Sequence, residues 1–105
     1  MQVEQVENEL GITLSWKTLV EMDRDYTAYV HVLSEDGSLL AQLDRPPDGY
    51  PTSDWKPGEI VQDRYAILLP SDLQSGTYLI QSGFYHLPTQ ERLGEPQVIG
   101  QVEIQ

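Results

Sequence analysis

Hydrophobic and polar residues alternate with a period of two along much of this chain, which is the pattern of half-buried β-strands. The clearest example covers residues 10–17, where Leu10, Ile12, Leu14 and Trp16 alternate with small or polar residues. Trp16 is expected to face the core. Alternation, or a high density of Tyr, Val, Ile and Thr, also predicts strands over residues 26–33, 39–44, 60–69, 78–85 and 97–105. No stretch has the period of an amphipathic helix, so the pattern predicts an all-β fold.

The same alternation predicts which side chains share a face of a strand. In residues 26–33 it places Ala28, Val30 and Val32 on one face and Tyr29, His31 and Leu33 on the other. In residues 97–105 it places Val98, Val102 and Ile104 opposite Ile99, Gln101 and Glu103. In residues 60–69 one face holds Val61, Tyr65, Ile67 and Leu69, together with Asp63. A buried carboxylate must be paired or hydrogen-bonded. We therefore expect Asp63 to tie the 50s loop to its strand, through backbone N–H groups of that loop or through the neighbours of Arg64.

Turn signals divide these strands. Asp36-Gly37 predicts a hairpin with a type I′ turn between residues 26 and 44. Pro57-Gly58 fits the two central positions of a type II turn. Pro70 ends the strand before it, because proline has no N–H to donate to a ladder. Leu73 to Tyr78, which includes Gly76, has the form of a tyrosine corner, in which a Tyr hydroxyl binds the backbone a few residues upstream. Gly83 indicates a bulge or a close approach inside its strand.

Together, these elements predict an immunoglobulin-like antiparallel β-sandwich of about seven strands. The tyrosine corner favours the sandwich over a small barrel. At 105 residues the chain has room for one domain, expected over residues 10–105. Residues 1–9 are polar and acidic, and we expect either a weakly ordered end, which we favour, or an edge strand. The positions expected to be structural are Trp16, Gly58, Asp63, Pro70, Gly76 and Tyr78.

Charge narrows the classes of partner. The chain carries 17 acidic and six basic residues, which gives a formal net charge of −11. Such a surface repels phosphate backbones and anionic lipid headgroups, so nucleic-acid binding and direct membrane insertion are not expected.

There is no cysteine, which excludes disulfides, thiolate metal sites and cysteine nucleophiles. No apolar run is long enough to span a bilayer, so the isolated chain is expected to be soluble.

The long loop over residues 45–56 holds the first candidate binding site. Tyr50 and Trp55 could form an aromatic platform that stacks on a sugar ring, with Asp48, Asp54 and Asp63 as acceptors for hydroxyl groups. The alternative is that Trp55 covers the end of the core and fixes the loop, since a large ring with one polar group suits that role. We favour this alternative.

Catalysis and metal binding have weaker support. His31 and His86 are the only histidines, and neither has a second histidine at the spacing of a zinc site. His31 is expected to be a hydrogen-bonded side chain on a sheet face. Asp44, Asp48 and Asp54 do not follow the spacing of a calcium-binding loop. No nucleophile-elbow sequence is present. We therefore expect no enzyme activity, catalytic residue, metal or cofactor.

A series of short motifs occurs along the chain in an order that resembles that of a known family. They run from Leu14-x-Trp16 through Trp55-x-Pro57-Gly58 and Leu73-x-x-Gly76-x-Tyr78 to Gly83-Phe84-Tyr85. Over about residues 10–105, the chain resembles the C-terminal β-sandwich tail domain of bacterial polytopic, glycosyltransferase-like membrane proteins. The resemblance implies an accessory, extracytoplasmic module without an assigned active site. One departure is the short polar segment before Leu10, where such domains usually begin with an additional strand.

A weaker resemblance is to immunoglobulin-like domains built around several tryptophans, which act as protein-binding modules; this chain has two tryptophans. We therefore expect a non-catalytic accessory or interaction domain of a larger, membrane-anchored cell-envelope protein. Its expected partner is the membrane-embedded remainder of that protein, or another protein. The alternative is a carbohydrate-binding module that uses Trp55 and Tyr50 to bind a glycan.

Overall fold

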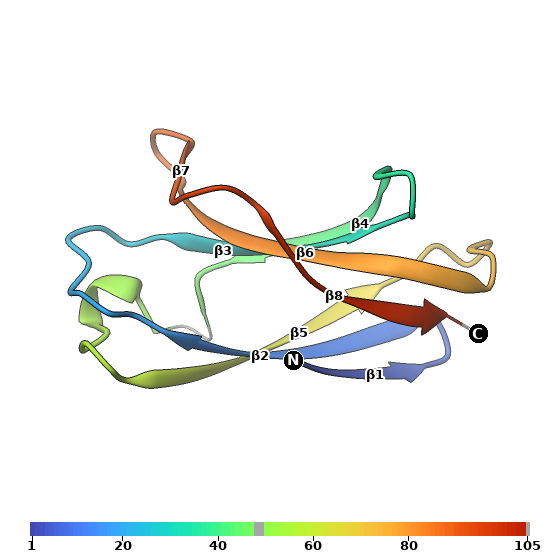
Figure 1. Ribbon diagram of the computed structural model, residues 1–105, viewed down its shortest axis with the longest axis horizontal. Helices are drawn as coiled ribbons and strands as arrows, with labels where there is room; N and C mark the ends of the chain where they lie inside the picture. The colour runs from blue at the N-terminus through green and yellow to red at the C-terminus, as the bar shows by residue number, and fades with distance from the viewer. Residues whose placement is uncertain (48–49, 105) are drawn as a thin grey trace.

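A computed structural model describes residues 1–47 and 50–104 of the chain. Its elements are β1 (Gln2–Val6), β2 (Glu9–Lys17), β3 (Thr27–Leu33), β4 (Leu39–Arg45), the 3₁₀-helix η2 (Thr52–Asp54), β5 (Ile60–Leu68), β6 (Gly76–His86), β7 (Glu91–Arg92) and β8 (Gln97–Ile104). Figure 1 shows them arranged in two layers. No helix in the described ranges has the length and apolarity needed to cross a bilayer.

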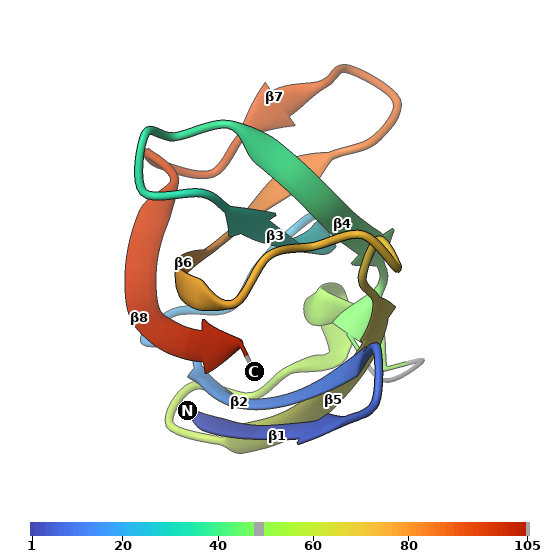
Figure 2. The same ribbon diagram turned by 90° about the vertical axis from the view of Figure 1, so that its right-hand side faces the viewer.

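The strands form two antiparallel sheets. The smaller sheet has the order β1-β2-β5, and the larger sheet has the order β4-β3-β6. Both β7 and β8 pair with β6, β7 near its end at Tyr85 and His86 and β8 along residues 76–82. The end-on view in Figure 2 shows the two sheets facing each other. The predicted all-β antiparallel sandwich is therefore confirmed.

Apolar residues from both sheets fill the space between the layers. The predicted face of β5 is correct, because Val61, Asp63, Tyr65 and Ile67 are buried while the residues between them are exposed. The core cluster consists of Leu10, Ile12, Leu14, Ala28, Val30, Val32, Tyr65, Ile67, Leu69, Tyr78, Ile80 and Ile104. Burial of each Leu, Ile or Val side chain in this set stabilises the fold by about 1.5–3 kcal/mol. Trp16 is half-buried beside the core, and its ring meets Phe84 edge-on at 4.6 Å.

The N-terminal segment is an edge strand. β1 pairs with β2 in a regular antiparallel register, in which Val3 faces Ile12. The same segment reaches across to the larger sheet, since Cε of Met1 lies so close to Gly100 of β8 that an added Cβ atom would collide with it. Of the two alternatives expected for residues 1–9, the structure contains the edge strand.

Two local predictions are confirmed by hydrogen bonds. Gly58 has a φ of +85°, and the backbone N–H of Glu59 donates to the carbonyl of Lys56 at 2.9 Å, as a type II turn requires. Tyr78 donates its hydroxyl to the carbonyl of Gln74 at 2.5 Å, which is the predicted tyrosine corner. β5 ends at Leu68, two residues before Pro70. The Pro57-Gly58 turn precedes β5, whereas Pro70 and the tyrosine corner lie where the chain passes from β5 of the smaller sheet to β6 of the larger sheet.

The predicted type I′ turn at Asp36-Gly37 is wrong. Such a turn needs a positive φ at both central residues, but in this turn only Gly37, at +91°, has one. The N–H of Gly37 instead donates to the carbonyl of Ser34, and the N–H of Ser34 donates to the carbonyl of Ser38, both at 2.9 Å. This is the longer hairpin loop in which a turn is followed by a left-handed glycine.

The predicted face of the last strand is also wrong at its start. The alternation predicts that Val98 shares a face with Val102 and Ile104, but Val98 is 55% exposed whereas Ile104 is buried. The cause is a β-bulge: Gly100 pairs with Ile80, whereas the adjacent Gln81 pairs with Val98, so Ile99 is the extra residue. A one-residue shift moves every side chain before it to the opposite face.

Candidate ligand-binding pocket

The structure does not contain the exposed aromatic platform expected at Trp55. This side chain is 2% exposed, its ring meets Phe84 edge-on at 6.1 Å, and its Nε1 donates to the carbonyl of Tyr50 at 3.0 Å. A sugar ring therefore has no face of the indole on which to stack. Trp55 instead takes the alternative role, in which it covers the core and fixes the loop.

The other residues predicted around this loop are also engaged internally or lie at the surface. The hydroxyl of Tyr50 donates to the Glu59 carboxylate at 3.0 Å and lies 3.1 Å from the carbonyl of Asp54. Asp54 belongs to η2 and is exposed. Asp48 lies outside the described residues. The loop is anchored by Thr52, which is fully buried and whose hydroxyl accepts a hydrogen bond from the N–H of Tyr26 at 2.9 Å.

Asp63 is buried, as its strand face predicted, and it binds the side chain of Arg45, a partner that the sequence did not predict. Its carboxylate is buried and accepts a hydrogen bond from Nη1 of Arg45 at 2.9 Å. The Arg45 guanidinium also lies over the Tyr65 ring, 4.4 Å from its centroid, and donates to the carbonyl of Arg64. Burial raises the pKa of Tyr65, and the nearby Asp63 carboxylate adds to that shift. This pair therefore links β4 of the larger sheet to β5 of the smaller sheet.

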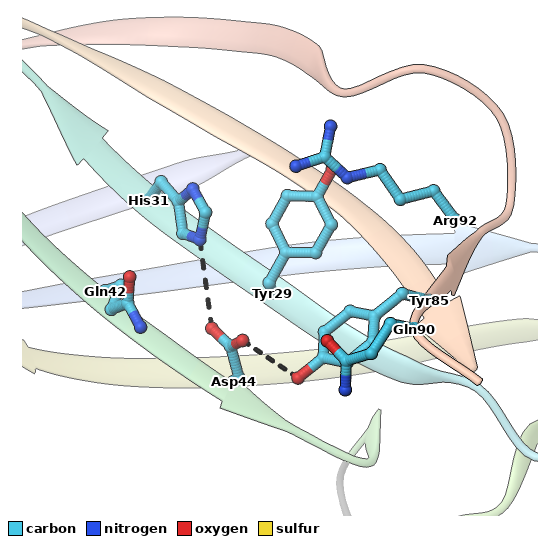
Figure 3. Close-up of a pocket in the computed structure, with 7 residues that line it drawn as sticks. All are labelled: Tyr29, His31, Gln42, Asp44, Tyr85, Gln90 and Arg92. Carbon is cyan, nitrogen blue, oxygen red and sulfur yellow. Dashed lines mark hydrogen bonds and ion pairs between the residues drawn. The ribbon is translucent and has the colours of Figure 1, made fainter. Parts of the chain in front are cut away.

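A different group of residues lines a pocket on the outer face of the larger sheet. The pocket has a volume of about 300 Å³. It is lined by Tyr29 and His31 of β3, Gln42 and Asp44 of β4, Tyr85 of β6, Gln90 of the β6–β7 turn and Arg92 of β7, as Figure 3 shows. Among these, the sequence pattern predicts a polar role on a sheet face only for His31.

Strand register and a glycine bring these side chains together. Tyr29 and His31 are alternate residues on the outward face of β3, and they pair directly with Asp44 and Gln42 of β4. Gly83 of β6 pairs with Tyr29, and a Cβ atom at Gly83 would collide with the Tyr29 hydroxyl. The close approach predicted at Gly83 is therefore present, because the Tyr29 ring lies across the neighbouring strand.

The aromatic rings form the floor of the pocket. The ring centroids of Tyr29 and His31 are 4.8 Å apart, and those of Tyr29 and Tyr85 are 6.1 Å apart. Tyr29 is 4% exposed, so it supports the other groups more than it offers a surface of its own. Tyr85 and His31 are half-buried, and each keeps part of its ring accessible.

The polar groups of the pocket are ordered around Asp44. The Tyr85 hydroxyl donates to Oδ2 of Asp44 at 3.0 Å, and Nε2 of His31 lies 3.9 Å from Oδ1. Arg92 is exposed, and Figure 3 shows it and Asp44 on opposite sides of the Tyr29 ring. The pocket thus presents an anionic group and a cationic group, with the amides of Gln42 and Gln90 able both to donate and to accept.

We expect the pKa of His31 to lie below its ordinary value of 6.5, because burial disfavours the imidazolium and the Asp44 carboxylate only partly offsets this. The replacement Asp44→Asn should lower the pKa of His31 further. In the natural chain, the pKa of His31 is lower in the folded state than in the unfolded state. The folded state therefore binds fewer protons as the pH falls. The stabilising contribution of neutral His31 is therefore complete above 6.5 and is lost as the pH falls through the pKa of the folded state. NMR titration of the imidazole tests this, and a pKa above 6.5 would contradict it.

Metal ligands do not gather in the described part of the chain, where no group of three or more His, Asp or Glu side chains could hold an ion. His86 lies outside the pocket and contacts the Thr89 hydroxyl through Nδ1 at 2.9 Å.

The pocket offers a ligand a set of hydrogen-bonding groups beside partly accessible aromatic rings. The one signal of it in the sequence is the placement of Tyr29 and His31 on the face opposite Ala28 and Val30.

The chain was compared with known proteins by sequence and by structure. The chain matches none of the protein-family models, curated proteins or solved structures with which it was compared.

Proposed function

We propose that this chain is a non-catalytic accessory domain that binds a saccharide in the pocket on the outer face of its larger sheet. One observation carries the proposal: hydrogen-bonding side chains from β3, β4, β7 and the β6–β7 turn converge on one cavity of about 300 Å³. That volume is at the lower end of the range for small-molecule sites, and it suits one sugar unit.

The chemistry of the lining residues supports a polyhydroxylated ligand. Asp44 accepts hydrogen bonds, while Gln42 and Gln90 both donate and accept them, so each can bind a sugar hydroxyl group. The half-buried ring of Tyr85 offers an apolar surface with a polar group at its end, which suits the C–H face of a sugar ring. This proposal keeps the carbohydrate-binding alternative but moves its site from Trp55 to the sheet face.

The structure of the pocket favours binding over catalysis. Its lining residues include no Ser, Thr or Cys that could act as a nucleophile beside His31. Asp44 and His31 come from adjacent paired strands, which hold side chains more rigidly than loops do. The groups are therefore positioned to recognise a ligand.

We also propose that the domain belongs to a larger cell-envelope protein and lies outside the cytoplasm. Two features support an immunoglobulin-like accessory module: the separation of β1-β2-β5 from β4-β3-β6, and the tyrosine corner at Tyr78. Its partner in that setting is the membrane-embedded remainder of the same protein, or another protein. Membrane-spanning segments in the same reading frame would support this setting.

NMR titration of the ¹⁵N-labelled chain tests the proposed binding site. We expect saccharides of a panel that contains neutral hexoses, N-acetylated hexosamines and uronic acids to shift the amide signals of His31, Asp44 and Arg92 at ligand concentrations of about 1–10 mM. The variant Asp44→Ala should lose these shifts, whereas Asp54→Ala on the η2 loop should keep them. Absence of any shift with the whole panel, or shifts confined to the Tyr50–Trp55 loop, would contradict the proposal.

A further inference from the structure

Arg92 is the only cationic arginine or lysine that lines the pocket. It belongs to β7, which folds back so that Arg92 pairs with Tyr85 of β6. This short hairpin sets the position of the Arg92 backbone. Figure 3 shows the guanidinium beside the hydroxyl end of Tyr29, away from Asp44.

The Arg92 guanidinium is free to bind a ligand. The other arginines are engaged: Arg24 pairs with Glu91 at 3.6 Å, Arg45 with Asp63 at 2.9 Å and Arg64 with Glu4 at 3.6 Å. Within residues 1–47 and 50–104, Arg92 makes no ion pair of this kind. An unpaired guanidinium at the edge of a pocket binds a carboxylate through two parallel hydrogen bonds, which is the geometry that its planar fork favours.

We propose that the preferred ligand of the pocket is an acidic saccharide, a uronic acid unit whose carboxylate binds Arg92 while its hydroxyl groups bind Asp44 and the nearby amides. This inference rests on the proposed saccharide-binding function and specifies its ligand class. The opposite placement of Arg92 and Asp44 sets the orientation, because a ligand carboxylate beside Asp44 would be repelled.

The electrostatics of the site agree with this orientation. Burial raises the pKa of Tyr29. Of the charges that act on its hydroxyl, Arg92 has the largest effect and opposes the rise, whereas the Asp44 and Glu95 carboxylates add to it. The net charge of −11 disfavours anions at long range. At physiological salt, however, charges beyond about 8 Å are largely screened, whereas a direct contact with Arg92 is not.

The test compares methyl galacturonoside with its methyl ester, which has the same hydroxyl groups but no charge. We expect the acid to bind about tenfold more tightly than the ester, as measured by NMR titration at physiological salt. The variant Arg92→Gln should bind the two ligands about equally, because it lacks the charge that favours the acid. The control Arg64→Gln, on the smaller sheet, should retain the tenfold preference.

The outcomes separate the ligand class from the function. Equal binding of acid and ester by the natural chain, or an unchanged preference in Arg92→Gln, would overturn the acidic ligand and leave saccharide binding standing. Displacement of the sugar by acetate at the same concentration would also overturn it, because Arg92 would then recognise a carboxylate without a sugar. Absence of binding by either ligand, and by the rest of the saccharide panel, would overturn both proposals.

Discussion

Replacement of Trp55 by alanine is expected to lower the free energy of unfolding by about 4 kcal/mol, which is typical of deleting a buried tryptophan side chain. The indole is 2% exposed and contacts Phe84 and Tyr50, so its loss leaves a cavity at the end of the core. It also removes the donor to the carbonyl of Tyr50. Urea denaturation followed by tyrosine fluorescence or circular dichroism measures the loss.

The variant Trp55→Phe is the matched comparison. It keeps a ring in the core and removes the indole N–H, so we expect a smaller loss of about 1–2 kcal/mol. A loss below about 1 kcal/mol in Trp55→Ala would mean that the ring is not part of the core. A failure of Trp55→Ala to bind sugars would report unfolding and would not locate the site, which is why the binding tests above use Asp44 and Arg92.

The second large effect is expected for Arg45→Met, with a loss of about 3 kcal/mol in the free energy of unfolding. The Asp63 side chain is completely buried, so removing Arg45 leaves its charge without its cationic partner. The Arg45 side chain itself is 30% exposed, which places the effect at the lower end of the range for buried ion pairs. Urea denaturation at neutral pH measures it.

The pair Arg64–Glu4 provides the control. Its side chains are 60% and 70% exposed, and Arg64→Met should cost less than about 1 kcal/mol. The double variant Arg45→Met/Asp63→Leu should recover much of the stability lost in Arg45→Met, because it buries no charge. Equal losses in Arg45→Met and Arg64→Met would contradict the structural role of the buried pair.

This ion pair connects stability to the pocket. β4 is an edge strand that pairs only with β3 in the larger sheet, and Arg45 is its last residue. The contact of Arg45 with Asp63 fixes that end of β4 to the smaller sheet. Asp44, the adjacent residue, points to the opposite face and forms the centre of the pocket. A core contact on one face of β4 therefore lies next to a pocket-lining side chain on the other.

Local patterns were sufficient for most of the fold. The alternation along β5 identified its buried face, including Asp63, because successive side chains of a strand point to opposite faces. Pro57-Gly58 and the segment before Tyr78 were recognisable because each needs only neighbouring residues to form its turn. Asp36-Gly37 identified the hairpin correctly but not its turn type, which the loop length decides.

Contacts between distant segments settled what these patterns left open. The bulge at Ile99 depends on how β8 pairs with β6, so alternation alone placed Val98 on the wrong face. Trp55 suits either an exposed platform or a buried anchor, and the packing of Phe84 against it made it an anchor. The pocket joins residues from β3 to β7 that share no sequence pattern.

Residue types and their spacing determine strands and faces, because these depend on neighbours in the chain. Partners, register and the pocket depend on which strands meet, and that follows from packing of the whole core.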